Sequence, residues 1–142
     1  MKKLTGSVIF VLFFISAHAQ KINETEAQQF LERVWSYLKT SDSVAFINLW
    51  PVEDSAWQTM NAPAGINYME SFHRLKKFLS PAITSNLAID HVVVGAENTQ
   101  GTEITAMLKP REHAYLGFTF HVAFVNDKWI PRGKPNYLAK SK

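Results

Sequence analysis

Four histidines follow residue 19, and imidazole is the side chain best suited to metal binding and to proton transfer near neutral pH. They are His73, His91, His113 and His121. Glu70 and His73 have the Glu-x-x-His spacing of carboxylate-bridged metal sites, but no second copy of the motif occurs, and such sites need one. His113 and His121 would lie about 26 Å apart on one continuous strand, too far to share an ion. We therefore expect no metal and no cofactor.

His91 is the strongest candidate for a reactive group. In a strand that begins at Leu87, it would share one face with Ile89 and Val93, which are both apolar and β-branched. If that face packs inward, the imidazole lies on an apolar wall, where it could act as a general base or orient a ligand. The alternative is a core histidine that makes one hydrogen bond. Asp90 would lie on the opposite, solvent face and could not orient the ring.

Three aromatic side chains are candidates for the lining of a ligand pocket: Trp50, Trp57 and Tyr68. Such rings offer a large apolar area together with a polar tip, and at a pocket mouth they would suit an apolar, aromatic or carbohydrate ligand. The alternative is that they belong to the core, since aromatic residues at helical spacing are usually buried there. Together with His91, these three residues form the predicted pocket.

Several classes of chemistry lack the residues that they need. The chain has no cysteine, which excludes disulfides, thiolate metal sites and cysteine nucleophiles. It contains no Gly-x-Ser-x-Gly elbow, glycine-rich phosphate loop or dinucleotide-binding fingerprint. The net charge is +3, and without Lys2 and Lys3 the 15 basic residues fall to 13 against 12 acidic ones. We therefore expect no nucleic-acid partner, which usually requires a clustered basic face.

The first residues have the pattern of a secretory signal peptide. Two lysines are followed by an apolar run over residues 8–15, and then by Ala17 and Ala19 at the positions that a signal peptidase recognises. The run is much shorter than the roughly 20 residues that cross a bilayer. We expect cleavage after Ala19, which leaves one domain of residues 20–142, periplasmic or secreted, without membrane contact. The alternative is an uncleaved anchor.

The first part of this domain has the spacing of amphipathic helices. Asn23 and Glu26 can form a capping box at the start of the first helix. Asp42 can cap a short second helix, and a third is expected over about residues 66–79, with Pro81 closing it. The predicted buried positions are Ala27, Phe30, Leu31, Val34 and Leu38 in the first helix and Tyr68, Phe72, Leu75 and Leu79 in the third.

From residue 87 the apolar period changes from helical to alternating, which indicates antiparallel strands. Strands are expected over residues 87–95 and 102–109, joined by a turn at residues 98–101. The third strand is the clearest, and it places His121 on the solvent side. Its core-facing residues are Leu116, Phe118, Phe120, Val122 and Phe124.

A two-residue turn at residues 126–127 predicts a hairpin at the end of the sheet. A short fourth strand over residues 128–130 would return beside the third, with Trp129 opposite Phe124. Pro131 and the residues after it would end regular structure. Helices first and antiparallel strands after them indicate an α+β fold, with N-terminal helices packed on one face of the sheet.

The order of these motifs resembles that of the nuclear-transport-factor-two-like (SnoaL-like) superfamily. Residues 40–50 resemble its second-helix signature, and Gly65 followed by Phe72 resembles its third helix. Residues 89–94 resemble its first long strand, and residues 124–130 its last hairpin. The resemblance implies a cystatin-like α+β cone, in which a curved antiparallel sheet wraps a long helix and leaves a pocket at the open end. It implies no activity, because a fold does not fix a function.

Three functions are compatible with the sequence. The first is non-catalytic binding of a small apolar or aromatic ligand, or of a protein partner, outside the cytoplasm. The second is a cofactor-free enzyme of the isomerase or dehydratase kind, with His91 as general base. The third is an interaction module that forms a homodimer through the open sheet face carrying Tyr115, Thr119 and His121. A second carboxylate or a tyrosine within hydrogen-bond reach of His91 would favour the enzyme.

Overall fold

The computed structural model describes residues 20–51, 68–109 and 114–141. The predictions for the signal peptide, for Trp57, for the loop at Gly65 and for the turn after Lys109 lie outside these residues. The described elements, in chain order, are α1 (Glu24–Thr40), α2 (Ser43–Ile47), α4 (Tyr68–Phe78), α5 (Ser80–Thr84), β1 (Ile89–Asn98), β2 (Gly101–Leu108), β3 (Ala114–Val125) and β4 (Lys128–Ser141).

Helix α1 begins where the sequence predicts, because its capping box forms. The Asn23 side chain accepts a hydrogen bond from the Glu26 amide at 2.8 Å, and the Glu26 carboxylate accepts one from the Asn23 amide at 3.1 Å. The whole predicted apolar stripe of this helix is buried. Trp35 is buried beside the stripe, and its indole N–H donates to the Leu87 carbonyl at 2.9 Å. This bond ties the middle of α1 to the segment before β1.

The shorter helices follow the predicted boundaries with one exception. Ser41 takes a left-handed conformation after α1, with φ 61°, and the Asp42 side chain accepts a hydrogen bond from the Ala45 amide at 3.0 Å to begin α2. The predicted apolar face of α4 is buried. Helix α4 ends at Phe78, before Pro81 as predicted, but a further short helix that the sequence does not predict, α5, begins at Ser80 with Pro81 in its first turn. Proline is tolerated there, since the first N–H groups of a helix make no intrahelical bond.

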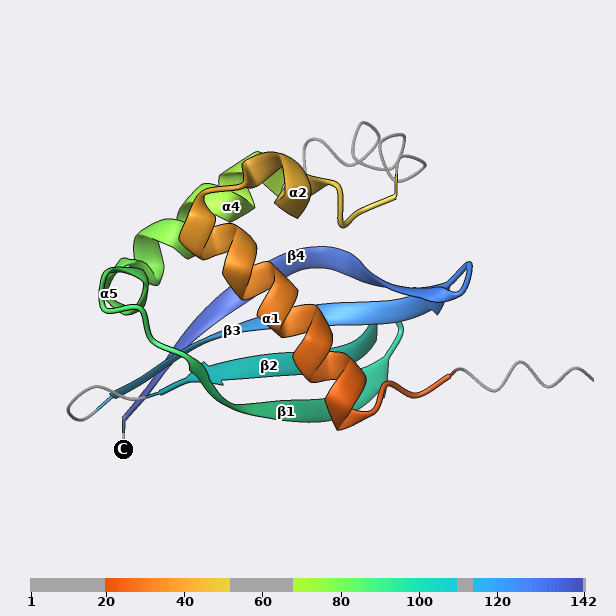
Figure 1. The fold of residues 1–142 in the computed structure, drawn as a ribbon. Helices are drawn as coiled ribbons and strands as arrows, with labels where there is room; N and C mark the ends of the chain where they lie inside the picture. The colour runs from red at the N-terminus through yellow and green to blue at the C-terminus, as the bar shows by residue number, and fades with distance from the viewer. Residues whose placement is uncertain (1–19, 52–67, 110–113, 142) are drawn as a thin grey trace, which may run out of the picture.

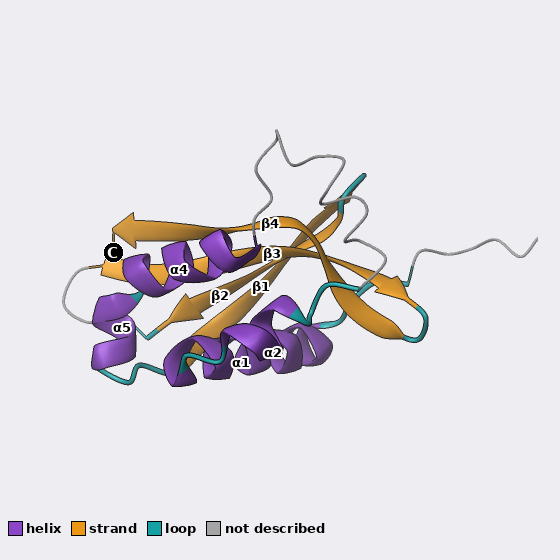
Figure 2. Cartoon of the chain, turned by 90° about the horizontal axis from the view of Figure 1, so that it is seen from above, coloured by secondary structure: helices purple, strands orange, loops and turns teal. Residues whose placement is uncertain are grey.

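The strands form one open antiparallel sheet in the order β1-β2-β3-β4, and the helices lie on one of its faces (Figure 1 and Figure 2). Helix α1 packs against β1 and β2, and α4 packs against β4. The predicted alternation in β3 is confirmed, because Phe118, Phe120 and Val122 are buried toward the helices. His121 points to the opposite face, where its side chain is only 15% exposed and lies 3.6 Å from the Glu103 carboxylate. The chain therefore has the predicted α+β fold.

Strand β4 is much longer than predicted. It continues through Pro131, which pairs with Val122 of β3, and runs to Ser141. The prediction that regular structure ends at Pro131 is therefore wrong. In the described sheet β4 is an edge strand with a partner on one side only, so a proline there can direct its missing N–H away from the ladder.

The ladder between β3 and β4 is irregular at one point. Arg132 pairs with His121 and Asn136 pairs with Thr119, so three residues of β4 face one residue of β3 between these pairs. Gly133 lies in this irregular stretch with φ +67°, a conformation that glycine adopts without steric cost. Beyond this stretch β4 pairs with β3 again, from Asn136 to Ser141, so the strand continues past the irregularity.

An aromatic cluster fills the core between the helices and the sheet. The ring of Phe120 lies 5.6 Å from that of Phe30, 6.2 Å from Phe46 and 6.1 Å from Trp50, measured between centroids. Trp50 in turn stacks on Tyr68 at 4.1 Å. All five side chains are buried. Since burial of one large apolar side chain contributes about 1.5–3 kcal/mol, this cluster is a main source of stability in a chain without disulfides.

Candidate functional site

His91 lies on the outer face of the sheet, away from the helices. Ile89 pairs with Leu108 and His91 with Met107, so β1 advances two residues while β2 advances one. Such a bulge changes which side chains face the core, and Val92 rather than His91 packs against it. His91 is therefore not on the apolar wall where the simple alternation from Leu87 would place it.

The His91 imidazole is half exposed, and its Nδ1 lies 2.9 Å from the Asp90 carboxylate. The prediction that Asp90 could not orient the ring is therefore wrong, and the reason is the same bulge. The Tyr115 ring lies edge-on to the imidazole, with centroids 6.2 Å apart. His91 lines neither of the two cavities described below, so this carboxylate–imidazole pair stands on an open surface.

Trp50 and Tyr68 do come together, but in the core. Their rings are stacked at 4.1 Å with an interplanar angle of 15°, and each residue is 4% exposed. The Trp50 indole Nε1 has no hydrogen-bond partner among the described residues. The alternative considered for these aromatics, that they belong to the core, therefore holds for Trp50 and Tyr68. Trp57 lies outside the described residues.

A groove of 300 Å³ lies between α1, the end of α2 and the β3–β4 hairpin, and it is termed the hairpin groove. Its apolar lining comes from Phe30, Leu49, Phe124, Trp129 and Ile130. Its charged lining comes from Glu26, Arg33, Asp127 and Lys128. Because the two acidic and two basic groups balance, net charge does not select the occupant. Aromatic and apolar contact would therefore provide most of the affinity at this groove.

Trp129 brings to the lining of the hairpin groove an indole N–H that is unpaired among the described residues. Asn126 and Asp127 both have positive φ, 50° and 61°, as the predicted two-residue turn requires, and the turn places Trp129 opposite Phe124 as predicted. The two rings lie 5.1 Å apart. The Trp129 indole Nε1 is buried without a hydrogen-bond partner among the described residues. Since buried donors are normally paired, an acceptor on a bound molecule would complete this one.

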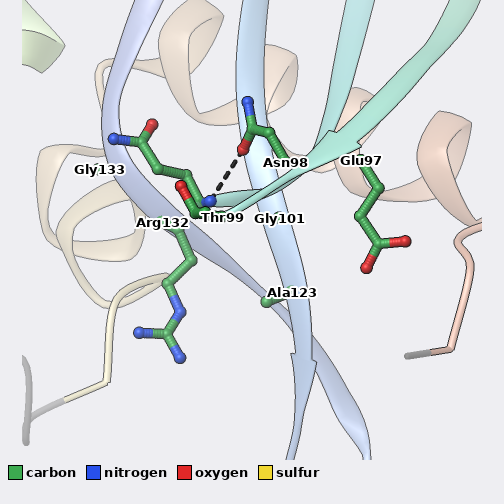
Figure 3. Close-up of a pocket in the computed structure, with 8 residues that line it drawn as sticks. Glu97, Asn98, Thr99, Gly101, Ala123, Arg132 and Gly133 are labelled. Atoms are coloured by element: carbon green, nitrogen blue, oxygen red, sulfur yellow. Dashed lines mark hydrogen bonds between the residues drawn. The ribbon is translucent and has the colours of Figure 1, made fainter. Parts of the chain in front are cut away.

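A second cavity, of 470 Å³, lies where the β1–β2 turn meets β4, and it is termed the turn cavity (Figure 3). Glu97 and Arg132 line it from the two sides of Ala123. The predicted β1–β2 turn forms, and within it the Gln100 amide donates to the Asn98 side chain at 2.8 Å. Five of the eight lining residues of this cavity have polar or charged side chains, and none of the eight is aromatic.

Two glycines with positive φ line the turn cavity, and one of them allows a close approach of the backbone. At Gly101, with φ +119°, a Cβ atom would lie 2.3 Å from the Val122 carbonyl oxygen of β3. No real side chain fits at that distance, so the turn can pack on β3 only with glycine at this position. Gly133 lies across the cavity near the Gln100 side chain, also with positive φ.

The outer sheet face carries the residues of the expected homodimer surface. Thr119 is buried there and its hydroxyl is hydrogen-bonded to that of Thr105. Tyr115 and His121 are partly exposed. None of the described helices covers this face (Figure 1). Thr119 therefore offers no unpaired hydroxyl to a partner.

Sequence reasoning located neither cavity. The sequence predicts that Phe124 and Trp129 face each other on the core side, but it does not predict a groove beside them. The one local feature that could indicate a site is the Trp129 indole N–H near the start of a strand. For the turn cavity the sequence held no comparable signal, because Arg132 and Gly133 were expected in irregular chain beyond the last strand. Both sites depend on contacts between distant segments.

None of the helices described here is long and apolar enough to cross a membrane. Within residues 20–51, 68–109 and 114–141, no three His, Asp or Glu side chains are placed to hold a metal ion together. No family model, curated protein or solved structure matches the chain. The function is therefore inferred from the cavities and from the residues that line them.

Proposed function

We propose that this domain is a non-catalytic binding module that holds a small aromatic or apolar ligand in the hairpin groove. The observation that carries the proposal is the buried Trp129 indole N–H, which has no partner among the described residues and belongs to a side chain that lines the groove. Phe30 and Phe124 add aromatic lining to the same groove. Ligand sites typically combine apolar walls with a few polar groups that fix orientation, as this groove does.

The groove favours a ligand with an aromatic or apolar body and one hydrogen-bond acceptor. The body would pack on Phe124 and Phe30, and the acceptor would take the Trp129 N–H. The volume of 300 Å³ is at the lower end of ligand sites, which span about 300–1,000 Å³. The occupant is therefore a small molecule, or one inserted side chain of a protein partner.

Two measurements test this proposal. Native mass spectrometry of the purified protein would reveal a ligand that co-purifies with it. An anilinonaphthalene sulfonate dye, which has an aromatic body and acceptor oxygens, is then titrated by fluorescence. Trp129→Phe keeps an aromatic ring and removes the N–H, so we expect dye affinity to fall about 3–10-fold, the equivalent of one net hydrogen bond.

Trp50→Phe is the matched control. It removes a second indole N–H that has no partner among the described residues, but Trp50 lies in the core and does not line the groove. Dye affinity should therefore stay at the wild-type value once folding of the variant is verified by circular dichroism. Equal affinity of Trp129→Phe and the wild type, or no saturable dye binding, would reject the proposal.

An enzymatic function is the second candidate, and the Asp90–His91 contact is the observation that favours it. A carboxylate that accepts from Nδ1 leaves Nε2 of the ring free to exchange a proton with a substrate. The pair lies on an open face rather than in either cavity, so we rank it below binding. If the domain turns over a substrate, His91→Gln should lower the rate about 100-fold or more without changing dye affinity; an unchanged rate would exclude His91 as the base.

We also propose that the domain is exported and related to the nuclear-transport-factor-two-like superfamily. The basic start, apolar run and Ala17-x-Ala19 site support export to the periplasm or medium. A long α1 packed across an antiparallel sheet supports the relationship. Protein recovered outside the cytoplasm should begin at Gln20, and an intact Met1 there would reject cleavage.

A further inference from the structure

We propose that the turn cavity is a second binding site, and that it takes a small zwitterion with a carboxylate and an ammonium group, such as a free amino acid or a short peptide. Glu97 at the end of β1 and Arg132 on β4 carry opposite charges and line the same cavity (Figure 3). The hairpin groove has a different lining and a different ligand class. The proposal therefore stands or falls independently of the proposed function.

The two charges have no partner in the described part of the chain. Glu97 and Arg132 are not within salt-bridge distance of each other or of any other described charge. His121 is the cross-strand neighbour of Arg132, but its ring lies 3.6 Å from Glu103 instead. A guanidinium and a carboxylate that line one cavity from its two sides, without neutralising each other, present complementary groups to a ligand that carries both signs.

Each charge has a distinct role in such a complex. The planar guanidinium of Arg132 can donate two parallel hydrogen bonds to a ligand carboxylate. The carboxylate of Glu97 can accept from the ligand ammonium group. Asn98 and Gln100 add neutral side-chain amides to the lining. The cavity volume of 470 Å³ is within the range of sites that hold small molecules, about 300–1,000 Å³.

Two backbone irregularities fix where these charges stand. Between Val94 and Glu97, β1 advances three residues while β2 advances two, and this bulge sets the position of Glu97. The irregular stretch of β4 that contains Gly133 begins directly after Arg132. Bulges redirect side chains and are frequent beside functional sites. The close contact at Gly101 holds the turn between them against β3.

The test is binding of a panel of free amino acids and simple dipeptides to the full-length mature domain, followed by heteronuclear NMR. We expect at least one zwitterion to bind saturably below about 10 mM and to shift the amide signals of Glu97, Gly101 and Arg132. Its N-acetyl derivative, which lacks the ammonium group, and its amide, which lacks the carboxylate, should each bind about tenfold more weakly.

Glu97→Gln and Arg132→Gln test the assigned roles. Glu97→Gln should remove the preference for the zwitterion over its N-acetyl derivative, and Arg132→Gln the preference over its amide. Glu103→Gln is the matched control, because it makes the same change of charge on β2 without lining the cavity, and it should leave affinity unchanged. Trp129→Phe should also leave it unchanged, which separates this site from the hairpin groove.

Three results would overturn the proposal. The first is no saturable binding by any member of the panel. The second is a set of shifted amides that excludes the turn cavity. The third is a loss of zwitterion affinity in Glu103→Gln as large as the loss in Glu97→Gln. Such a result would mean that the general negative charge of the surface, rather than a specific site, attracts the ligand.

Discussion

Thr105 and Thr119 face each other across β2 and β3, and their hydroxyl oxygens are 2.9 Å apart. The two residues are 8% and 7% exposed although they lie on the sheet face away from the helices. A buried hydroxyl that loses its partner costs about 1–3 kcal/mol. The pair thus satisfies two polar groups at the centre of the outer face and links the two middle strands through their side chains.

Valine substitutions at these positions should be strongly non-additive. Thr105→Val and Thr119→Val each leave one buried hydroxyl unpaired, so each should lower the free energy of unfolding by about 1–2 kcal/mol. The double variant contains neither hydroxyl, so it should lose less free energy of unfolding than the two single variants lose together. Urea unfolding of the four proteins gives the coupling energy. Simple additivity would mean that the hydroxyls have other partners.

Phe120 and His121 are neighbours on opposite faces of β3. Phe120 contacts three aromatic rings of the core, so Phe120→Ala should lower the free energy of unfolding by about 3–5 kcal/mol. The His121 side chain lies on the outer face, where it is 15% exposed and its charged neighbour among the described residues is Glu103 at 3.6 Å. His121→Ala removes no part of the aromatic core, so it should cost about 1–2 kcal/mol, less than Phe120→Ala. Urea unfolding of the two variants gives both free energies. A larger loss of unfolding free energy for His121→Ala than for Phe120→Ala would contradict the assignment of the two faces of β3.

The features that the sequence predicted correctly depend on near neighbours. The Asn23–Glu26 capping box needs four consecutive residues, and the two-residue turn before Trp129 needs only the conformations of Asn126 and Asp127. Strict alternation around Phe120 identified the buried face of β3 for the same reason. Each of these signals is complete within one segment, so no knowledge of the remaining chain was required.

The features that the sequence missed depend on partners elsewhere in the chain. Alternation alone put His91 on the same face as Ile89, whereas a bulge against β2 reversed it. In the sequence alone, Pro131 indicates the end of a strand. It fits inside β4 because β4 is an edge strand of the described sheet. The hairpin groove joins α1 to the β3–β4 hairpin, and no local pattern brings these segments together. The positions of both cavities therefore depend on strand register and on packing between segments that are far apart in the sequence.

Gly101→Ala should be strongly destabilising although it adds only one carbon atom. The new Cβ would lie 2.3 Å from the Val122 carbonyl oxygen, and φ is +119°, so the substitution combines a clash with backbone strain. We expect a loss of at least about 2 kcal/mol in the free energy of unfolding. Gly95→Ala is the control, because its Cβ would lie 3.3 Å from the Glu103 oxygen without positive φ. Similar losses at both positions in thermal melts would contradict this account of Gly101.

The last prediction concerns the β3–β4 turn. Asp127 has φ 61°, a conformation in which a Cβ atom costs roughly 1–2 kcal/mol and which glycine adopts freely. Asp127→Gly should therefore raise the free energy of unfolding by up to about 1 kcal/mol, because Asp already tolerates this region better than most residues. Asp127→Val should lower it by about 1–2 kcal/mol, since a β-branched side chain is strained there.

Asn126→Gly separates turn strain from charge. Asn126 has φ 50° in the same turn but carries no charge, and it does not line the hairpin groove. Both glycine variants should be at least as stable as the wild type, whereas only Asp127→Gly removes a carboxylate from the groove and should tighten binding of the anionic dye. Equal dye affinity in the two glycine variants would mean that Asp127 contributes to the turn alone. Destabilisation by both would mean that the turn does not need positive φ, and that Trp129 is held opposite Phe124 by other contacts.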